Sequence, residues 1–255
     1  MLKKSTLLLL TLAFSLLSIS FNAGADAMED IFKSGKLRVG VSLFTPWAMK
    51  DAKGELTGFE IDVARQLARD MGVKPEFHVF EWDKIISGLQ QKQVDVIVAG
   101  MTITPQRALK INFSQPYAEG GITMATNTAM TRDIKSLKEL NSPDTLIAVV
   151  SGTTASELAK RIFNKAKVQD FVTPEEAIAA IVGDKAHAYI ASKPQPEFLA
   201  LKHADKVDIP LNKPLRSDMA GMAINKGEQE WLNFINSWII AKKAEGWLKA
   251  SHKYW

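Results

Sequence analysis

Apolar segments of strand type alternate with segments of helical periodicity along this chain. Residues 37–41, 75–80 and 94–99 have the length and composition of strands, whereas the apolar side chains of residues 59–71 recur at helical spacing. Strands that alternate with helices form right-handed βαβ units on a mostly parallel sheet. The chain is therefore predicted to belong to the α/β class.

The same alternation returns in the second half of the chain. Residues 146–150, 168–172 and 187–191 are strand-like, and Thr173 with Pro174 forms a typical helix start, a capping residue followed by proline. Two successive α/β units predict two lobes, each a mostly parallel sheet flanked by helices.

The lobe boundaries follow from these units. We assign residues 26–118 and 219–255 to lobe 1, residues 122–213 to lobe 2, and the hinge to residues near 119–121 and 214–218. Residues 218–225 resemble a strand that returns to lobe 1, and the tail from residue 227 onward is an amphipathic helix. Two crossings make a two-stranded hinge, with a cleft where strand ends and helix starts meet.

The first 25 residues have the layout of a secretory signal peptide. Lys3 and Lys4 form a positive segment, an apolar run covers residues 7–17, and small residues at 22–25 allow cleavage before Asp26. A membrane-spanning helix needs about 20 apolar residues, so this short run, which is followed and interrupted by serines, favours a cleaved signal over an anchor. We therefore expect a periplasmic protein.

The composition excludes several chemistries. The chain has no cysteine, which excludes disulfides, iron–sulfur sites, a cysteine nucleophile and a lipoprotein anchor. The four histidines lack metal-ligand spacing and no nucleotide-binding or serine-hydrolase motif occurs, so we expect no metal, cofactor or catalytic residue. The net charge is +4, and removal of the two signal lysines leaves about +2 on scattered residues, which does not favour nucleic acid.

One loop carries the parts of an anion site. Residues 99–107 run from a buried strand into a segment that contains Gly100, Thr102 and Arg107. Gly100 lets backbone N–H groups approach a ligand closely, Thr102 offers a hydroxyl, and the planar guanidinium of Arg107 matches a carboxylate. On residue types alone, a surface arginine at an ordinary helix start is the simpler explanation.

The turn of residues 151–154 is a second candidate anion site. It lies between a strand end and a helix start, where free N–H groups and the helix dipole favour an anion. The hydroxyls of Thr153 and Thr154 add donors. Taken alone, simple N-capping explains these two threonines better.

In combination, these features resemble the family 3 extracellular solute-binding proteins, the polar amino-acid receptors of ABC importers. The resemblance covers almost all of the predicted mature chain, and its carriers are LRVGV at 37–41 with Pro46, TGFEIDV at 57–63, DVIVAGMTITPQR at 95–107, FSQPY at 113–117 and GTT at 152–154. It implies a two-lobed fold whose lobes close on a ligand.

The resemblance also implies roles for the two candidate anion sites. In the family, the arginine at the position of Arg107 binds the α-carboxylate of the ligand, and the positions of Gly100 and Thr102 contribute donors to the same head group. The position of Thr153 adds backbone or hydroxyl donors from the other lobe, and Thr154 is carried over less firmly.

Three aromatic residues, Phe44, Trp47 and Trp82, each follow a predicted strand end. Singly, each is more simply explained as a core residue than as the wall of a pocket. The resemblance implies that Phe44 and Trp82 sandwich the side chain of the ligand.

One position departs from the family pattern. Members usually carry an aspartate that pairs with the α-ammonium of the ligand, and Ser192 stands in its place. A buried charge that loses its partner costs roughly 2–5 kcal/mol. Three explanations are open: another acid replaces the partner, with Asp218 near the second crossing the best candidate; the ligand lacks a primary ammonium; or a quaternary ammonium lies against Trp82, Phe44 or Trp47.

We therefore expect the binding component of an ABC importer, a monomer that captures an amino acid or related small carboxylate by hinge closure and delivers it to an inner-membrane permease. The main alternative is an enzyme on the same scaffold, because some relatives of the family are dehydratases of cyclic carboxylates such as prephenate or arogenate. Glu157 would then be the acid, although the sequence offers no base beside it. A sensor ectodomain is disfavoured, because no membrane helix follows the signal.

Overall fold

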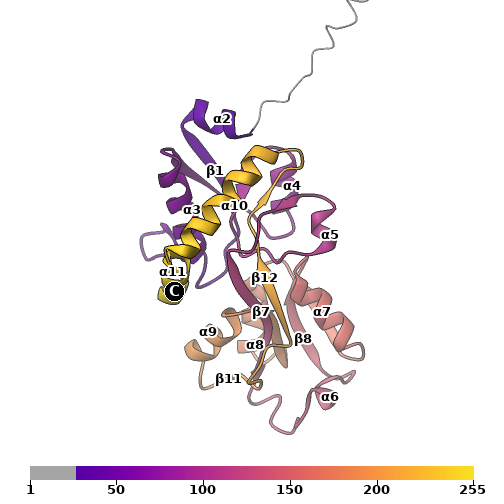
Figure 1. Cartoon of the computed structure of the whole chain (residues 1–255). Coiled ribbons are helices and arrows are strands. Elements are labelled where there is room, and N and C mark those ends of the chain that lie inside the picture. Colours follow the sequence, from indigo (N-terminus) through magenta and orange to yellow (C-terminus); the bar gives the residue numbers. More distant parts are fainter. Residues whose placement is uncertain (1–26) are drawn as a thin grey trace, which may run out of the picture.

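The computed structural model describes residues 27–255, which form two α/β lobes joined by two neighbouring strands (Figure 1). The predicted signal peptide, residues 1–25, lies outside the described residues. Within the described part of the chain, no helix has the length and apolar character needed to cross a membrane. The two-lobed α/β fold predicted from the sequence is confirmed.

Lobe 1 is built on a five-stranded sheet. Its strands are β1 (Lys36–Val41), β4 (Lys74–Val79), β5 (Val96–Ile97), β6 (Asn112–Phe113) and β13 (Ala223–Ile224), in the order β4-β1-β5-β13-β6. β1 runs parallel to β4 and β5, and β13 runs antiparallel to β5 and β6. The other elements are the ribbon β2 (Met49–Lys50) with β3 (Leu56–Thr57) and the helices α2 (Ala27–Ser34), α3 (Phe59–Asp70), α4 (Ile85–Gln90), α5 (Pro105–Ala108), α10 (Gln229–Ala244) and α11 (Trp247–Tyr254).

The core of lobe 1 forms where α3 and α10 cover the sheet. Leu67 of α3 and Val39 of β1 are fully buried, and they belong to one apolar cluster with Trp231 and Trp238 of α10. The apolar positions of α10 recur at helical spacing, so they share one face of the helix. Burial of each such side chain stabilises the lobe by about 1.5–3 kcal/mol.

Lobe 2 contains a six-stranded sheet. Its strands are β7 (Ala118–Asn127), β8 (Leu146–Val150), β9 (Lys167–Phe171), β10 (Ala188–Ser192), β11 (Val207–Asp208) and β12 (Arg216–Ala220), in the order β11-β7-β10-β8-β9 with β12 paired to β7. β8 runs parallel to β9 and β10, whereas β7 is antiparallel to β10, β11 and β12. The helices are α6 (Leu137–Leu140), α7 (Thr154–Ile162), α8 (Pro174–Val182) and α9 (Gln195–Lys202).

Strand β8 is buried on both faces because helices cover both sides of this sheet. Ile147 and Val149 point into a cluster with the apolar side chains of α7, whereas Ala148 and Val150 point into a second cluster with those of α8 and α9. Successive side chains of a strand alternate between the two faces of a sheet. The continuous apolar run in the sequence is therefore the expected pattern of a doubly covered strand.

Strands β7 and β12 connect the lobes (Figure 1). They pair antiparallel from Ala118↔Ala220 to Ile122↔Arg216, and Gly120 lies opposite Asp218. The predicted lobe ranges and the hinge segments 119–121 and 214–218 stay predictions.

Two predicted elements are divided in the structure. The predicted strand 218–225 is split, because β12 ends at Ala220 and β13 begins at Ala223 in the other sheet. The predicted single C-terminal helix ends at Gly246, which has a left-handed φ of 74° and separates α10 from α11. Glycine adopts this conformation without steric cost, so it commonly ends helices.

Candidate functional site

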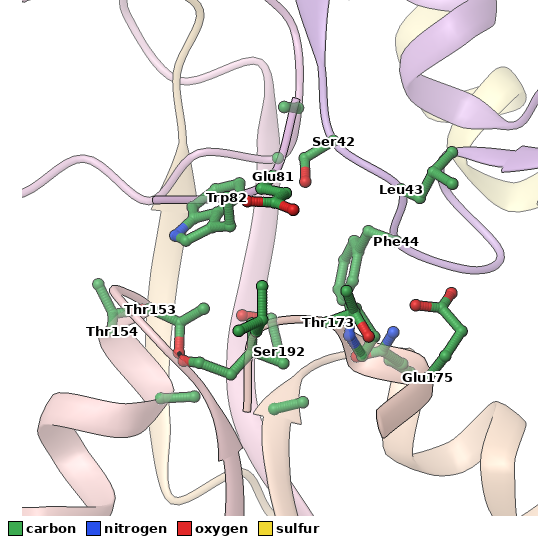
Figure 2. A pocket seen from close by; sticks show the side chains of 18 of the residues that line it. Ser42, Leu43, Phe44, Glu81, Trp82, Thr153, Thr154, Thr173, Glu175 and Ser192 are labelled. Carbon is green, nitrogen blue, oxygen red and sulfur yellow. Dashed lines mark hydrogen bonds between the residues drawn. The ribbon is translucent and has the colours of Figure 1, made fainter. Parts of the chain in front are cut away.

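A cavity of about 280 Å³ lies between the two lobes (Figure 2). It forms where the carboxyl ends of β1, β4 and β5 in lobe 1 face the carboxyl ends of β8 and β10 and the starts of α7 and α8 in lobe 2. Clefts at the carboxyl ends of parallel strands are the usual ligand sites of open α/β sheets. Polar and aromatic residues from both lobes line it, among them Ser42, Phe44, Glu81, Trp82, Gly100, Thr102, Thr153, Thr154, Glu175, Tyr189 and Ser192.

Most of the residues predicted to contact a ligand line this cavity. They are Phe44, Trp82, Gly100 and Thr102 from lobe 1 and Thr153, Thr154 and Ser192 from lobe 2. Arg107 and Asp218 are not among the lining residues, but each contacts one of them. The structure thus brings all nine together around one cavity, while their contacts with a ligand stay predictions.

A buried hydrogen-bond network contacts Gly100 on the side away from the cavity. Gly100 has a left-handed φ of 59°, and its N–H donates to the hydroxyl of Tyr117 at 3.0 Å. Tyr117 donates in turn to Glu60, which is fully buried and whose Oε1 has no hydrogen-bond partner. Desolvation by burial raises the pKa of Glu60 from 4.5 to about 7. A titratable carboxyl group therefore lies directly behind the wall of the cavity.

Arg107 lies between the lobes beside Trp82. It belongs to the short helix α5, which Thr104 caps by accepting from the Arg107 backbone N–H. Nη1 donates to the carbonyl oxygen of Thr102 at 3.0 Å, Nη2 donates to that of Gly152 at 3.2 Å, and the guanidinium lies 5.3 Å from the centre of the Trp82 ring. Within residues 27–255 no carboxylate forms an ion pair with it.

Desolvation lowers the pKa of Arg107, although arginine remains charged at neutral pH. The guanidinium has five N–H donors, and the two carbonyl oxygens use two of them. A half-buried cation with spare donors and no carboxylate partner in the described chain is the arrangement that a ligand carboxylate completes.

The hydroxyl of Thr102 links the hinge to lobe 2. Its Oγ1 donates to Asp218 at 3.1 Å and lies 3.5 Å from Oγ1 of Thr154. Burial raises the pKa of Asp218 above its ordinary value, while Thr102, Arg216 and Arg107 act in the opposite direction. Because the hydroxyl hydrogen of Thr102 is directed to Asp218, its oxygen is left to accept a hydrogen bond from Thr154 or from a ligand.

The start of α7 presents backbone donors to the cavity. Oγ1 of Thr153 accepts from the Ser156 N–H at 3.1 Å and donates to the Val150 carbonyl at 2.7 Å, so its hydroxyl is committed to N-capping. Thr154 and Ala155 begin the helix and both line the cavity. The first N–H groups of a helix lack intrahelical acceptors, and the helix dipole adds positive potential there. This site therefore supplies backbone N–H groups rather than the Thr153 hydroxyl.

Trp47 is a core residue, the simpler of the two explanations that its sequence position allowed. Its ring is buried in the core of lobe 1, where the ring centres of Phe59 and His252 lie 5.5 Å and 4.9 Å away. Phe44 and Ala48 pair as a β-bridge across a tight turn, which directs Phe44 to the cavity and Trp47 to the core. The large apolar surface of Trp47 is thus removed from water by its own lobe.

The sequence interpretation missed two carboxylates in the cavity, Glu81 and Glu175. Glu175 lies in the first turn of α8, where the helix dipole is sufficient to explain an acid. Glu81 directly precedes Trp82 in the loop after β4, and this neighbour was the signal that could have revealed it. Glu157, the acid considered for a dehydratase, is exposed and outside the lining, and its role in an enzyme stays a prediction.

Comparisons with known proteins agree with this geometry. The family model for bacterial extracellular solute-binding proteins, family 3, matches residues 37–255. The L-cystine-binding protein TcyJ of Escherichia coli is 25% identical over 240 residues, which cover 94% of this chain and 89% of that protein. The cyclohexadienyl dehydratase of Pseudomonas aeruginosa is a more distant relative, 22% identical over 94% of this chain and 90% of its own length.

A solved structure shares the arrangement of the lobes. It is the crystal structure of the ancestral amino acid-binding protein AncCDT-1, described as a precursor of cyclohexadienyl dehydratase. It is 37% identical to this chain, covers 91% of it and 99% of its own length, and superposes with a TM-score of 0.81.

Proposed function

The chain belongs to the bacterial extracellular solute-binding proteins of family 3, and from this premise we propose that it is the periplasmic binding component of an ABC importer for an amino acid or a related small carboxylate. One observation carries the proposal. The free N–H groups at the start of α7 line the cavity from lobe 2, and Arg107 of lobe 1, without a carboxylate partner in residues 27–255, lies beside the cavity against the lining residue Trp82. A carboxylate is the group that both sites bind.

Capture proceeds by hinge closure. Arg107 of lobe 1 binds the carboxylate in the open form, and the start of α7 in lobe 2 then binds the same group. Only contacts that differ between the two forms shift their populations, and the N–H groups of Thr154 and Ala155 supply such a difference. Trp82 and Phe44 enclose the rest of the ligand, because both rings line the cavity.

An α-ammonium finds acceptors although Ser192 replaces the expected aspartate. Ser192 lines the cavity, and the Thr102 oxygen there is free to accept because its hydrogen is directed to Asp218. Asp218 thus acts on the ammonium through Thr102. This arrangement supports the first of the three explanations, although Asp218 itself stays one hydrogen bond away from the cavity.

A thermal-shift screen tests the proposed function. Amino acids, betaines and small carboxylic acids are compared, and a ligand present at 100 times its dissociation constant is expected to add about 2.7 kcal/mol to the unfolding free energy. The proposal predicts that at least one amino acid raises the melting temperature. It fails if none does while the protein unfolds cooperatively.

The dehydratase relative keeps an enzymatic function as the second candidate. We place binding first, because the relatives named above include an amino acid-binding protein and an L-cystine-binding protein. Formation of product from prephenate or arogenate by the purified protein would establish the alternative. For the proposed function, the protein works as a monomer with an inner-membrane permease and uses neither nucleic acid nor cofactor.

A further inference from the structure

Two carboxylates of the cavity have no role in the mechanism above. Glu81 of lobe 1 and Glu175 of lobe 2 both line the cavity, and their side chains form no hydrogen bond or ion pair with the described residues. Neighbouring acids are engaged elsewhere. Asp83 pairs with Lys84 at 3.0 Å, and Glu176 closes the capping box of α8 with Thr173. Glu81 and Glu175 are exposed at the cavity and have no hydrogen bond or ion pair in the described chain, although Lys84 also lies within electrostatic range of Glu81.

The lining carries no compensating positive charge. None of its residues is a lysine, arginine or histidine, and Glu81 and Glu175 are its two charged members. Arg107, behind Trp82, donates to backbone carbonyls and forms an ion pair with neither glutamate. A cationic group in the cavity finds in each glutamate an acceptor for a charge-assisted hydrogen bond that no described residue uses. Because they belong to different lobes, closure directs both toward the same ligand.

Glu175 lies across the cavity from the anion site, and Glu81 lies between the two (Figure 2). In Figure 2, Thr153 and Trp82 lie on one side, Phe44 and Glu175 lie on the other, and Glu81 lies between them near Ser42. A ligand whose carboxylate binds at Arg107 and the start of α7 therefore extends its other end toward Phe44 and Glu175. The face of the Phe44 ring also favours a cation.

We propose that Glu81 and Glu175 make the site selective for basic amino acids, in which an ammonium or guanidinium group is present in addition to the amino-acid head group. This inference rests on the proposed function and adds the ligand class to it. Primary ammonium and guanidinium groups donate the charge-assisted hydrogen bonds that free carboxylates accept, whereas a quaternary ammonium has no N–H to donate.

The test compares ligands that differ in charge but little in shape. Isothermal titration calorimetry is carried out with L-arginine, its neutral isostere L-citrulline, L-lysine, L-glutamine and glycine betaine. We expect L-arginine or L-lysine to bind at least about tenfold more tightly than L-citrulline and L-glutamine. In the double variant Glu81→Gln/Glu175→Gln the preference is expected to fall to about threefold or less.

A matched control removes the same charge outside the cavity. Glu230 in lobe 1 and Asp133 in lobe 2 are exposed and absent from the lining, so Glu230→Gln/Asp133→Asn is expected to keep the preference for basic ligands. Thermal unfolding verifies that both double variants are folded.

The outcomes distinguish failure of the proposed selectivity for basic amino acids from failure of the proposed function. Equal binding of L-arginine and L-citrulline by the wild type, a preference retained in Glu81→Gln/Glu175→Gln, or tightest binding of glycine betaine overturns the inference and leaves carboxylate capture intact. If no amino acid binds to the folded wild type, the proposed function fails and the inference fails with it. A loss of preference confined to Glu81→Gln/Glu175→Gln supports both.

Discussion

Nε1 of Trp82 in lobe 1 donates a hydrogen bond to the carbonyl oxygen of Gly152 in lobe 2 at 3.0 Å. Nη2 of Arg107 donates to the same oxygen at 3.2 Å. One backbone carbonyl in a left-handed turn, where Gly152 has a φ of 70°, therefore accepts two hydrogen bonds from the opposite lobe. These two hydrogen bonds connect the lobes without a ligand, so we expect them to favour the closed form.

Replacement of Trp82 by phenylalanine tests this connection. The variant Trp82→Phe keeps an aromatic wall but lacks the indole donor. A neutral hydrogen bond contributes about 0.5–1.5 kcal/mol, so the ratio of closed to open protein is expected to fall about two- to tenfold without ligand. Distances between spin labels on the two lobes measure the ratio.

Trp255 provides a matched control for this variant. Its indole N–H donates to Asp62 at 2.8 Å within lobe 1, so Trp255→Phe loses a comparable hydrogen bond without affecting the cleft. The label distances of Trp255→Phe should equal those of the wild type. An unchanged distribution in Trp82→Phe would show that the Gly152 contact does not influence closure.

Arg107 is predicted to contribute most to carboxylate binding. In Arg107→Ala the charge and the spare N–H donors are lost, and the dissociation constant measured by calorimetry is expected to rise at least about tenfold. Arg132 is exposed and lies outside the cavity lining, so Arg132→Ala serves as the control. Near-native affinity in a folded Arg107→Ala protein rejects Arg107 as the carboxylate ligand.

Ser192 is predicted to limit the binding of ordinary amino acids. Ser192→Asp places a carboxylate in the cavity where relatives pair with the α-ammonium, and affinity across a panel of L-amino acids is expected to increase by about tenfold. Ser192→Asn has a similar shape without the charge and should not reproduce the gain. The interpretation of this position is abandoned if the aspartate and asparagine variants bind the panel equally.

Glu60 is predicted to make stability depend on pH. Its folded-state pKa is about 7 and its ordinary value is 4.5, because burial disfavours the charged form. The folded state thus binds the proton more tightly than the unfolded state, so this contribution is present below pH 4.5 and is lost as the pH rises toward about 7. The total loss is on the order of 3 kcal/mol.

The variant Glu60→Gln cannot ionise, and its unfolding free energy should lack this decline. Urea unfolding between about pH 4 and 8 measures both proteins. Glu230→Gln removes an exposed carboxylate and is expected to follow the wild-type curve. Parallel curves for the wild type and Glu60→Gln would assign the pH dependence to other groups.

Local patterns in the sequence were sufficient to predict the two-lobed α/β architecture. The apolar run of residues 146–150 predicted a strand, which forms as β8, and the Thr173–Pro174 start of α8 predicted a capped helix, which forms with a complete capping box. Such features depend on contacts within one element or with its direct neighbours. They can therefore be recognised from the spacing of residue types alone.

The composition of the cavity was harder to predict, because it depends on contacts between distant segments. Phe44 and Trp47 are three positions apart and both aromatic, yet one faces the cavity and the other the core. Nothing in their spacing distinguishes them. The turn closed by the Phe44–Ala48 bridge directs the ring of Phe44 to the cavity and the ring of Trp47 to the core of lobe 1.

The sequence by itself determined two α/β lobes, a cleft at the strand ends, and a glycine-threonine-arginine loop beside it, since these follow from periodicity and motif. Only the tertiary structure decided that Arg107 shares the Gly152 carbonyl with Trp82 and that Glu81 and Glu175 line one cavity. The physical reason is the hinge. Residues from different lobes become neighbours when β7 and β12 bring the two sheets together. Local sequence patterns contain no information on which residues of the two lobes come into contact.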